Sequence, residues 1–283
     1  MSTANQLFPV DNATGVFPEL SNEAYHKAPG ISNTGLLLVG QAPAIYYGCR
    51  LDPRRPLEKS RAGQLEGTLA HCAILEPNAL DERYVVGPAV NKNTKVWKDF
   101  VADHPDQIAI TADQYDMAQR MRESVMGIPD VAEALSAGAG GAEQSAFWID
   151  EATGERCKVR PDYVASFRAG DILLDVKTYS SAAPHEFARQ IGRKGYQQQD
   201  AMYTEGWAKA AGRPVLGFVF VAVETEYPYA ASAVMLDEDS KAAGHRMFRR
   251  NLNAYAECRR TGHWPGYSSA IEIVSLSAYL KEE

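Results

Sequence analysis

The run ILLDVKTYS, at residues 172–180, places two charged side chains inside an otherwise apolar, strand-like segment. Burying the carboxylate of Asp175 or the ammonium of Lys177 beside Leu174 and Val176 costs several kcal/mol unless a partner or a metal compensates. Because alternate residues of a strand share a face, Asp175 and Lys177 project together. A fold that accommodates this run must therefore supply a polar or metal-binding environment on one face of a buried strand.

A second acidic residue lies upstream, in ERCKVRPDYVAS at residues 155–166, which predicts one strand with Lys158, Arg160 and Asp162 on a common face. If the turn FRAGD pairs the two strands with their polar faces aligned, Asp162 and Asp175 converge on one divalent cation. Carboxylates are ligands that Mg²⁺ prefers. Lys177 would then orient or help deprotonate an attacking water, or stabilise charge on a phosphate.

The helix predicted over residues 197–212 adds Gln199 and Tyr203, which are four residues apart and so share a face. An amide and a phenol there can contact a phosphate or hold a strand without adding charge. An isolated D-x-K pattern is more often a solvated pair, and Arg-Pro-Asp is also typical of an ordinary salt bridge or turn. The combination of an acidic residue, D-x-K and Q-x-x-x-Y favours a functional site.

The remaining elements indicate an α/β fold with a mixed sheet. Helices are predicted near Ser32, after Pro43, and over residues 62–77, 91–103, 111–126, 131–136, 181–195 and 237–262. Strands are predicted over residues 142–150, 215–224 and 231–237, besides the two described above, with a short extended segment at 84–90. Residues 1–20 lack periodicity and predict a flexible arm. The glycine run at residues 138–141 predicts an internal boundary.

Composition excludes several classes of protein. No apolar run approaches the roughly 20 residues that a membrane-spanning helix needs, and the first residues lack the pattern of a signal peptide, so we expect a cytoplasmic protein without a membrane partner. The four cysteines are scattered, which argues against a zinc knuckle or a disulfide framework. The net charge of −7 argues against a polyanion binder that works by bulk charge, but local basic patches can still guide a nucleic acid.

The segments VRPDYV, ILLDVKT and GYQQQDAMY together resemble the PD-(D/E)XK nuclease superfamily and, within it, the exonuclease VIII (RecE-type) family of phages and bacteria. GISNTGLLLVGQAPAIYY, GTLAHCAILEP and WPGY are similar to further segments of that family, so the resemblance extends from about residue 20 to 275. It implies a restriction-endonuclease-like core and one nuclease domain over residues 21–283. Residues 21–137 would form a mainly helical part, 142–237 the sheet core, and 238–283 a C-terminal helix and tail.

The resemblance also implies roles for particular residues. Asp162, Asp175 and the main-chain carbonyl of Val176 would bind the metal, and Lys177 would be the catalytic lysine. His71 would reach the metal from its helix, although by spacing alone it is an ordinary histidine at the edge of an apolar stripe. Further residues expected from the resemblance are Glu143 as support for the metal or water, and Gln199 and Tyr203 as the Q-x-x-x-Y pair. Apart from the resemblance, basic residues are candidate DNA contacts, with a solvated face as the alternative: Arg160, Arg189, Arg193, Lys194 and the basic cluster from Arg50 to Arg61.

The function expected from these residues and this resemblance is a Mg²⁺-dependent exodeoxyribonuclease, with Mn²⁺ as a substitute. It would act on linear double-stranded DNA ends in the 5′-to-3′ direction and leave 3′ single-stranded tails for recombination. The resemblance further implies a ring-shaped homo-oligomer and a single-strand annealing protein as a partner. Three alternatives remain: an endonuclease, a single-strand-specific nuclease, or a catalytically silent module that binds DNA ends.

Overall fold

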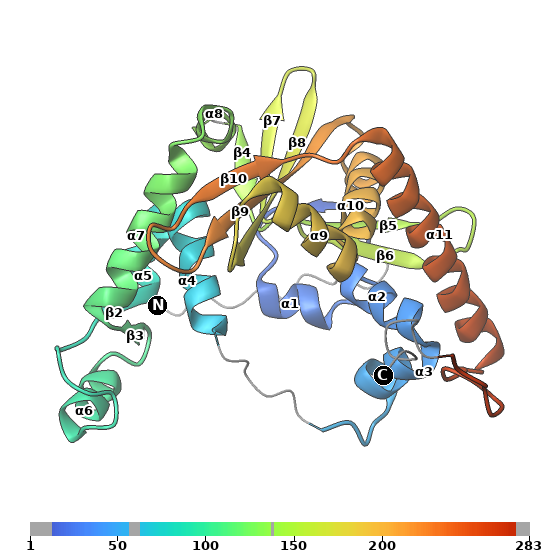
Figure 1. The fold of residues 1–283 in the computed structure, drawn as a ribbon, viewed down its shortest axis with the longest axis horizontal. Coiled ribbons are helices and arrows are strands. Elements are labelled where there is room, and N and C mark those ends of the chain that lie inside the picture. Colours follow the sequence, from blue (N-terminus) through green and yellow to red (C-terminus); the bar gives the residue numbers. More distant parts are fainter. Residues whose placement is uncertain (1–12, 57–62, 137–138, 276–283) are drawn as a thin grey trace.

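The computed structural model describes residues 13–56, 63–136 and 139–275. Its central feature is a five-stranded mixed sheet in the order β10-β9-β8-β7-β4 (Figure 1). Strands β8 and β9 run parallel, and the other neighbouring pairs run antiparallel. The five strands are β4 (Gly140–Ala142), β7 (Tyr163–Phe167), β8 (Gly170–Tyr179), β9 (Val215–Glu224) and β10 (Ala231–Val234). The predicted α/β fold with a mixed sheet is confirmed.

Helices cover both faces of this sheet, and successive residues of β8 alternate between them. Leu173 packs in a cluster with α10 (Tyr196–Ala211) and α11 (Glu238–Thr261). Leu174 and Val176 pack on the opposite face with α4 (Gln64–Leu75) and α7 (Ala112–Met126). Because strand side chains alternate, Asp175 projects toward α10 while Val176 projects toward α4. Both helical layers therefore border the charged part of β8.

A second sheet corrects the prediction that residues 155–166 form one strand. This segment divides into β6 (Arg156–Val159) and β7, which belong to different sheets. Strand β6 joins β5 (Ser145–Ile149) and β1 (Gly15–Phe17) in the antiparallel order β1-β5-β6. The break falls at Pro161, which has no N–H to donate to a continuing ladder. Lys158 and Asp162 consequently do not share a face, and the Lys158 ammonium instead binds main-chain carbonyls of residues 25, 26 and 28.

The N-terminal half contains α4 and α7, the helices that cover one face of the five-stranded sheet. Helices begin as predicted at Ser32, which caps α2 (Asn33–Gln41), and at Pro43, which opens α3 (Pro43–Tyr46). The helix predicted from residue 111 is also confirmed, because Thr111 and Gln114 form a capping box at the start of α7. The other elements here are α1 (Asn22–Lys27), a π-helix (Tyr47–Leu51), a 3₁₀ helix (Pro77–Ala79), α5 (Leu80–Arg83), β2 (Tyr84–Val86), α6 (Lys95–Asp103), β3 (Ile108–Ile110) and α8 (Pro129–Ser136), with β2 and β3 forming a small parallel pair.

Two expectations near the ends of this half change. Residues 1–12 of the predicted arm lie outside the described residues, but residues 15–17 form β1 rather than a free segment. The glycine run is an edge strand rather than a connector, because Gly140 and Gly141 pair with β7 as part of β4. A Cβ atom on Gly140 would lie 2.3 Å from the carbonyl oxygen of Val164, so this pairing requires glycine. Residues 137 and 138 lie outside the described residues.

Residues 142–150, predicted as one strand, divide instead between β4 and β5, which belong to different sheets. From α9 onward the chain matches its prediction closely. Helix α9 (Pro184–Lys194) leads directly into α10, and α11 ends at Gly262 in a left-handed conformation. A buried carboxylate ties α11 to the second sheet, because Asp150 in the β5–β6 turn accepts hydrogen bonds from Arg249 at 2.5 and 3.0 Å and from Thr153 at 2.7 Å. Within the described residues, no helix has both the length and the apolar character that crossing a membrane would need.

We expect Asp150→Ala to lower the free energy of unfolding by about 3 kcal/mol, because Arg249 would lose its partner in a largely buried setting. Urea denaturation at pH 7 measures this loss. Glu238→Ala removes the exposed partner of Lys241 and should change stability by less than about 0.5 kcal/mol. Equal stabilities for the two variants would contradict the assignment of Asp150.

The contribution of Asp150 should also depend on pH. Burial opposes its ionisation, but hydrogen bonds from Arg249 and Thr153 outweigh burial and lower the pKa of Asp150 to about 2. Its stabilising effect is therefore complete above the unfolded pKa of about 3.9 and is lost as pH falls toward 2. Denaturation of the wild type and of Asp150→Asn between pH 5 and pH 2 should give stability curves that converge at the acid end.

Candidate metal centre

The loop between the two sheets positions the first acidic residue of the site. Asp162 follows Pro161 at the start of β7, and its Oδ2 accepts a hydrogen bond of 2.8 Å from the main-chain N–H of Val176 in β8. Its own carbonyl accepts a bond of 2.9 Å from the N–H of Glu143. The break that Pro161 introduces thus lets one residue link β8, through its carboxylate, with the end of β4, through its carbonyl.

Three side chains from separate elements meet at this point. A nitrogen of His71 and carboxylate oxygens of Glu143 and Asp162 all lie within 4.8 Å of one another. His71 comes from α4, and its Nδ1 is 3.6 Å from Oδ2 of Asp162. The main chain of Val176 also hydrogen-bonds His71. One imidazole and two carboxylates at these separations can hold a divalent cation.

Glu143 has a backbone conformation that few residues of its type adopt, with φ of 56°. Its carboxylate accepts a bond of 2.6 Å from Nε of Arg160. Arg160 also donates to the Ser145 hydroxyl and the Leu20 carbonyl, and its side chain is only 12% exposed. Arg160, predicted as a DNA contact, therefore holds Glu143 in place. A glutamate held in the left-handed region by an ion pair with an arginine carries local backbone strain, and such strain is often retained at functional sites.

The charged pair of β8 forms the second half of the site. Nζ of Lys177 lies 2.5 Å from Oδ2 of Asp175, and the side chains are 21% and 2% exposed. Nε2 of Gln199 donates to Oδ1 of Asp175 at 2.6 Å. Oδ2 of Asp175 makes no hydrogen bond of regular geometry with any described residue. Asp175 therefore faces Lys177 and Gln199 rather than joining the close group of His71, Glu143 and Asp162.

Two tyrosines of α10 complete the surroundings. Lys177 lies over the ring of Tyr196 at 5.0 Å, a cation–π contact that the sequence pattern did not single out. Tyr203 packs edge-on against Phe218, and its hydroxyl is hydrogen-bonded by the main chain of Arg160. Burial raises the pKa of Tyr203 well above its usual value, so its hydroxyl stays protonated. Tyr203 is thus a neutral hydrogen-bonding group beside the carboxylates.

The electrostatics of the site favour added positive charge. Burial, reinforced by the charge of Asp175, raises the pKa of Asp162 well above its usual value. Burial disfavours the charged form of Lys177, but Asp175 and Asp162 outweigh this effect and raise its pKa. Burial and the charge of Lys177 lower the pKa of His71, which favours the neutral, metal-binding imidazole. The donors and the crowded carboxylates therefore fit a divalent cation.

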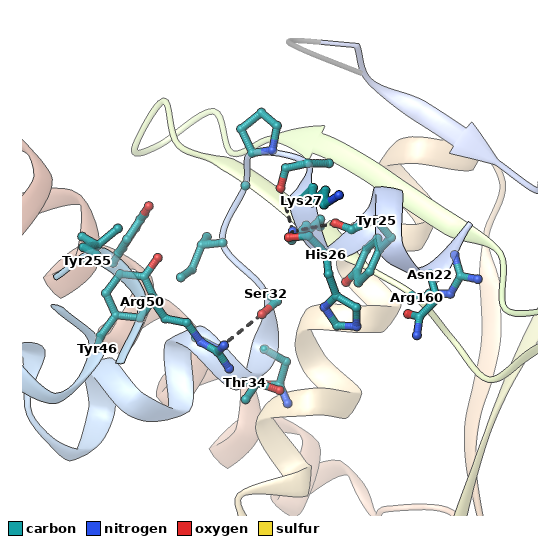
Figure 2. A pocket seen from close by; sticks show the side chains of 18 of the residues that line it. Asn22, Tyr25, His26, Lys27, Ser32, Thr34, Tyr46, Arg50, Arg160 and Tyr255 are labelled. Carbon is teal, nitrogen blue, oxygen red and sulfur yellow. Dashed lines mark hydrogen bonds between the residues drawn. The ribbon is translucent and has the colours of Figure 1, made fainter. Parts of the chain in front are cut away.

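A cavity of about 620 Å³ adjoins the site, and Glu143, Arg160 and Tyr203 form part of its wall. The rest of the wall comes mainly from α1, the loop to α2, and the π-helix with the turn after it. In Figure 2, Arg50 and Arg160 lie on opposite sides of this pocket. Among the described residues that line it, one has a carboxylate, Glu143, and six are lysine or arginine: Lys27, Arg50, Arg55, Lys158, Arg160 and Arg259.

The remaining expected DNA contacts lie on α9 and do not line this pocket. Arg189 is exposed and pairs with Glu186 at 2.8 Å, while Arg193 and Lys194 are exposed in the last turn of the helix. Arg61, part of the basic cluster noted in the sequence, lies outside the described residues. Sequence reasoning missed the basic pocket because its wall combines segments more than 200 residues apart, from Lys27 to Arg259.

Comparisons with known proteins bear on the family and the fold of the chain. Residues 53–277 match the family model described as a PDDEXK-like domain of unknown function (DUF3799). A crystal structure of a "putative exonuclease" from Eubacterium rectale is similar, with a TM-score of 0.59, 12% sequence identity, and coverage of 93% of this chain and 98% of that one. The structure of SSO0001 matches at a TM-score of 0.28 and 12% identity over 55% of this chain and 69% of that one, too weakly to support a common fold. No curated protein matches significantly.

The three-residue group predicts a measurable metal affinity. We expect Glu143→Gln to weaken Mn²⁺ binding by about tenfold or more, because even residues that only support a ligand contribute 10- to 100-fold. Electron paramagnetic resonance of free Mn²⁺, titrated with protein in the absence of nucleic acid, measures this change. Glu186→Gln makes the same substitution on the surface of α9 and should leave the affinity unchanged. Unaltered binding by Glu143→Gln would remove Glu143 from the site.

Proposed function

We propose a function for this chain, which belongs to the family of PDDEXK-like domains DUF3799 and therefore to the PD-(D/E)XK nuclease superfamily. We propose that it is a metal-dependent exodeoxyribonuclease that degrades linear double-stranded DNA from its ends. The observation that carries this proposal is the Asp175–Lys177 pair of β8, held by Gln199 beside the group of His71, Glu143 and Asp162.

His71, Glu143 and Asp162 would hold the cation, with Asp175 as a further carboxylate close by. When bound, a divalent cation supplies Lewis-acid polarisation of a phosphate and lowers the pKa of a bound water. Mg²⁺ prefers oxygen ligands, whereas imidazole is common around softer metals, so this mixed donor set suits Mn²⁺ as well as Mg²⁺. We therefore propose Mg²⁺ as the physiological ion, with Mn²⁺ as an effective substitute.

The charged state of Lys177 supports one of the two roles considered for it. Its pKa is raised by the neighbouring carboxylates, so it carries a proton at neutral pH and is a poor general base. Its ammonium would instead stabilise the negative charge that develops on the phosphate during hydrolysis. Gln199 would keep Asp175 oriented toward Lys177, and the Tyr203 hydroxyl would donate a hydrogen bond to the substrate.

The basic pocket supports a nucleic-acid strand as the substrate. Its excess of lysine and arginine provides local attraction for phosphates although the whole chain carries a charge of −7. Its volume adjoins Glu143 and Tyr203, so a strand in the pocket would have a phosphate near the candidate metal.

The finer parts of the proposal rest on likeness. Attack on ends is supported by the name of the structurally similar Eubacterium rectale protein and by the segments that resemble the exonuclease VIII family. From that resemblance we also propose 5′-to-3′ polarity, 3′ single-stranded products for recombination, a homo-oligomer, and an annealing protein as partner.

One digestion experiment tests the central claim. Linear duplex labelled at either 5′ or 3′ ends, a closed circular duplex and a single strand are incubated with the protein and Mg²⁺ or Mn²⁺. We expect loss of the linear duplex with early release of the 5′ label, and an intact circle. Cutting of the circle would establish an endonuclease, and preference for the single strand would establish a single-strand-specific enzyme. Binding of ends without any cleavage would establish a silent end-binding module.

Lys177→Met should lower kcat by about 10²- to 10³-fold, because it removes one preorganised charge from the reacting phosphate. Single-turnover digestion of a labelled duplex measures this loss. Lys98→Met removes an exposed lysine of α6 that has no assigned role, and it should retain activity within a few fold. Cleavage by Lys177→Met at the wild-type rate, with Mn²⁺ or Mg²⁺, would rule out the assigned role of Lys177.

Arg55→Gln should weaken DNA binding and reduce its dependence on salt. Each phosphate contact contributes about 0.9 to the slope of log K against log salt concentration for duplex DNA and about 0.7 for a single strand. We expect the slope to fall by about that amount when binding is measured by fluorescence anisotropy with Ca²⁺ in place of Mg²⁺. Arg120→Gln, on the exposed face of α7, serves as the matched control. An unchanged slope for Arg55→Gln would place the strand elsewhere.

A further inference from the structure

Three consecutive glutamines open α10, and each contacts a different part of the molecule. Gln197 lies against Met247 of α11, Gln198 reaches both α2 and α11, and Gln199 holds Asp175 of β8. Successive residues of a helix point about 100° apart, so a single turn presents its three amides in three directions. The first turn of α10 is therefore the point where the charged part of β8 is joined to two other helices.

Gln198 is the centre of a buried chain of hydrogen bonds. Nδ2 of Asn251 donates to Oε1 of Gln198 at 2.6 Å, and Nε2 of Gln198 donates to Oδ1 of Asn33 at 2.8 Å. Nε of Arg250 donates to Oδ1 of Asn251 at 3.2 Å and begins the chain. Every link runs in the same direction, from α11 through α10 to the first residue of α2. We call Asn251, Gln198 and Asn33 the amide chain.

The amide chain is buried, so each of its hydrogen bonds must be made within the protein. Gln198, Asn251 and Asn33 are 0%, 2% and 7% exposed, so water cannot replace a lost partner without entering the interior. A buried amide left without its partner is costly, whereas a complete network fixes a unique arrangement. Helices α2 and α11 also approach closely here, because a Cβ atom on Gly40 would lie 2.4 Å from Nδ2 of Asn251. The amide chain therefore fixes the position of the first turn of α10 relative to both α2 and α11.

We propose that Gln198, Asn33 and Asn251 are positioning residues of the candidate metal centre. They hold the first turn of α10 at the rotation and height from which Gln199 reaches Oδ1 of Asp175. Gln199 is adjacent to Gln198 on that turn, so a shift of the turn moves the Gln199 amide away from Asp175. Asp175 then loses the neighbour that keeps its carboxylate facing Lys177. This inference rests on the proposed function, since it assumes a cation beside Asp175.

The direction of the chain gives the inference a discriminating test at Asn33. An aspartate at this position still accepts the bond from Gln198, and its charge is favourable at the first residue of α2. Asn33→Asp should therefore keep the Mn²⁺ affinity of the DNA-free protein within about twofold. Asn33→Leu and Gln198→Leu break the chain and should weaken Mn²⁺ binding by about 3- to 10-fold, less than the change for a group that touches a ligand. Electron paramagnetic resonance of free Mn²⁺ measures all three.

Leu252→Ala is the control for a loss of stability alone. Leu252 is buried on α11, one residue from Asn251, and takes no part in the chain. It should lower the thermal midpoint without changing Mn²⁺ affinity. If Gln198→Leu does not fold, Asn251→Ser interrupts the chain at its other link and should show the same weakened binding.

The outcomes separate this inference from the proposed function. Wild-type protein that fails to bind Mn²⁺ overturns both. Wild-type binding together with unchanged affinity in Asn33→Leu, Gln198→Leu and Asn251→Ser overturns the positioning role alone. Equal weakening in Asn33→Asp and Asn33→Leu shows that the donor direction is wrong, and weakening in Leu252→Ala shows that general loosening of α11 is the cause.

Discussion

The ion pair between Asp175 and Lys177 is the interaction on which the rest of the structure depends. Both charges lie in a strand whose neighbours are buried on two faces, so neither is tolerated alone. The Gln199 amide occupies the second oxygen of Asp175, and the Tyr196 ring covers the ammonium of Lys177. Helix α10 is therefore required beside β8 for electrostatic reasons as well as for apolar packing.

The division of the sheet at Pro161 explains how a second carboxylate reaches this pair. If residues 155–166 had formed one continuous strand, the side chains of Asp162 and Lys158 would have projected from the same face of one sheet. Because β6 leaves for another sheet, the link residue Asp162 can bond the Val176 main chain, and Arg160 can hold Glu143. One proline thus converts a regular hairpin into a corner where α4, β4, β7 and β8 meet.

Much of the fold was predictable because its signals are local, as in the capping box at Thr111 and the apolar run of β9. Asp175, Lys177 and Gln199 were also identifiable, since charges inside an apolar strand and amides at helical spacing are local patterns. Asp162 belonged to the same pattern, but His71 and Glu143 were expected only from the family resemblance, and no local pattern indicated the geometry of Glu143. Its left-handed backbone and its arginine partner arise from tertiary contacts, and His71 alone looks like the edge of an apolar stripe. Proline 161 was present as a break signal, but the alternation of polar residues outweighed it.

The charge distribution of the site accounts for a nucleic-acid substrate better than the overall charge does. Two carboxylates, those of Glu143 and Asp162, lie together at the corner with the Asp175–Lys177 pair beside them. The adjoining pocket carries an excess of lysine and arginine. A polyanion alone would be repelled by the corner, and a cation alone would be repelled by the pocket. When both bind, the cation neutralises the carboxylates of the corner, and the phosphates of the strand neutralise the lysine and arginine side chains of the pocket. Binding of the strand and binding of the cation should therefore reinforce one another. The net charge of −7 keeps nonspecific attraction of nucleic acid to the rest of the surface small.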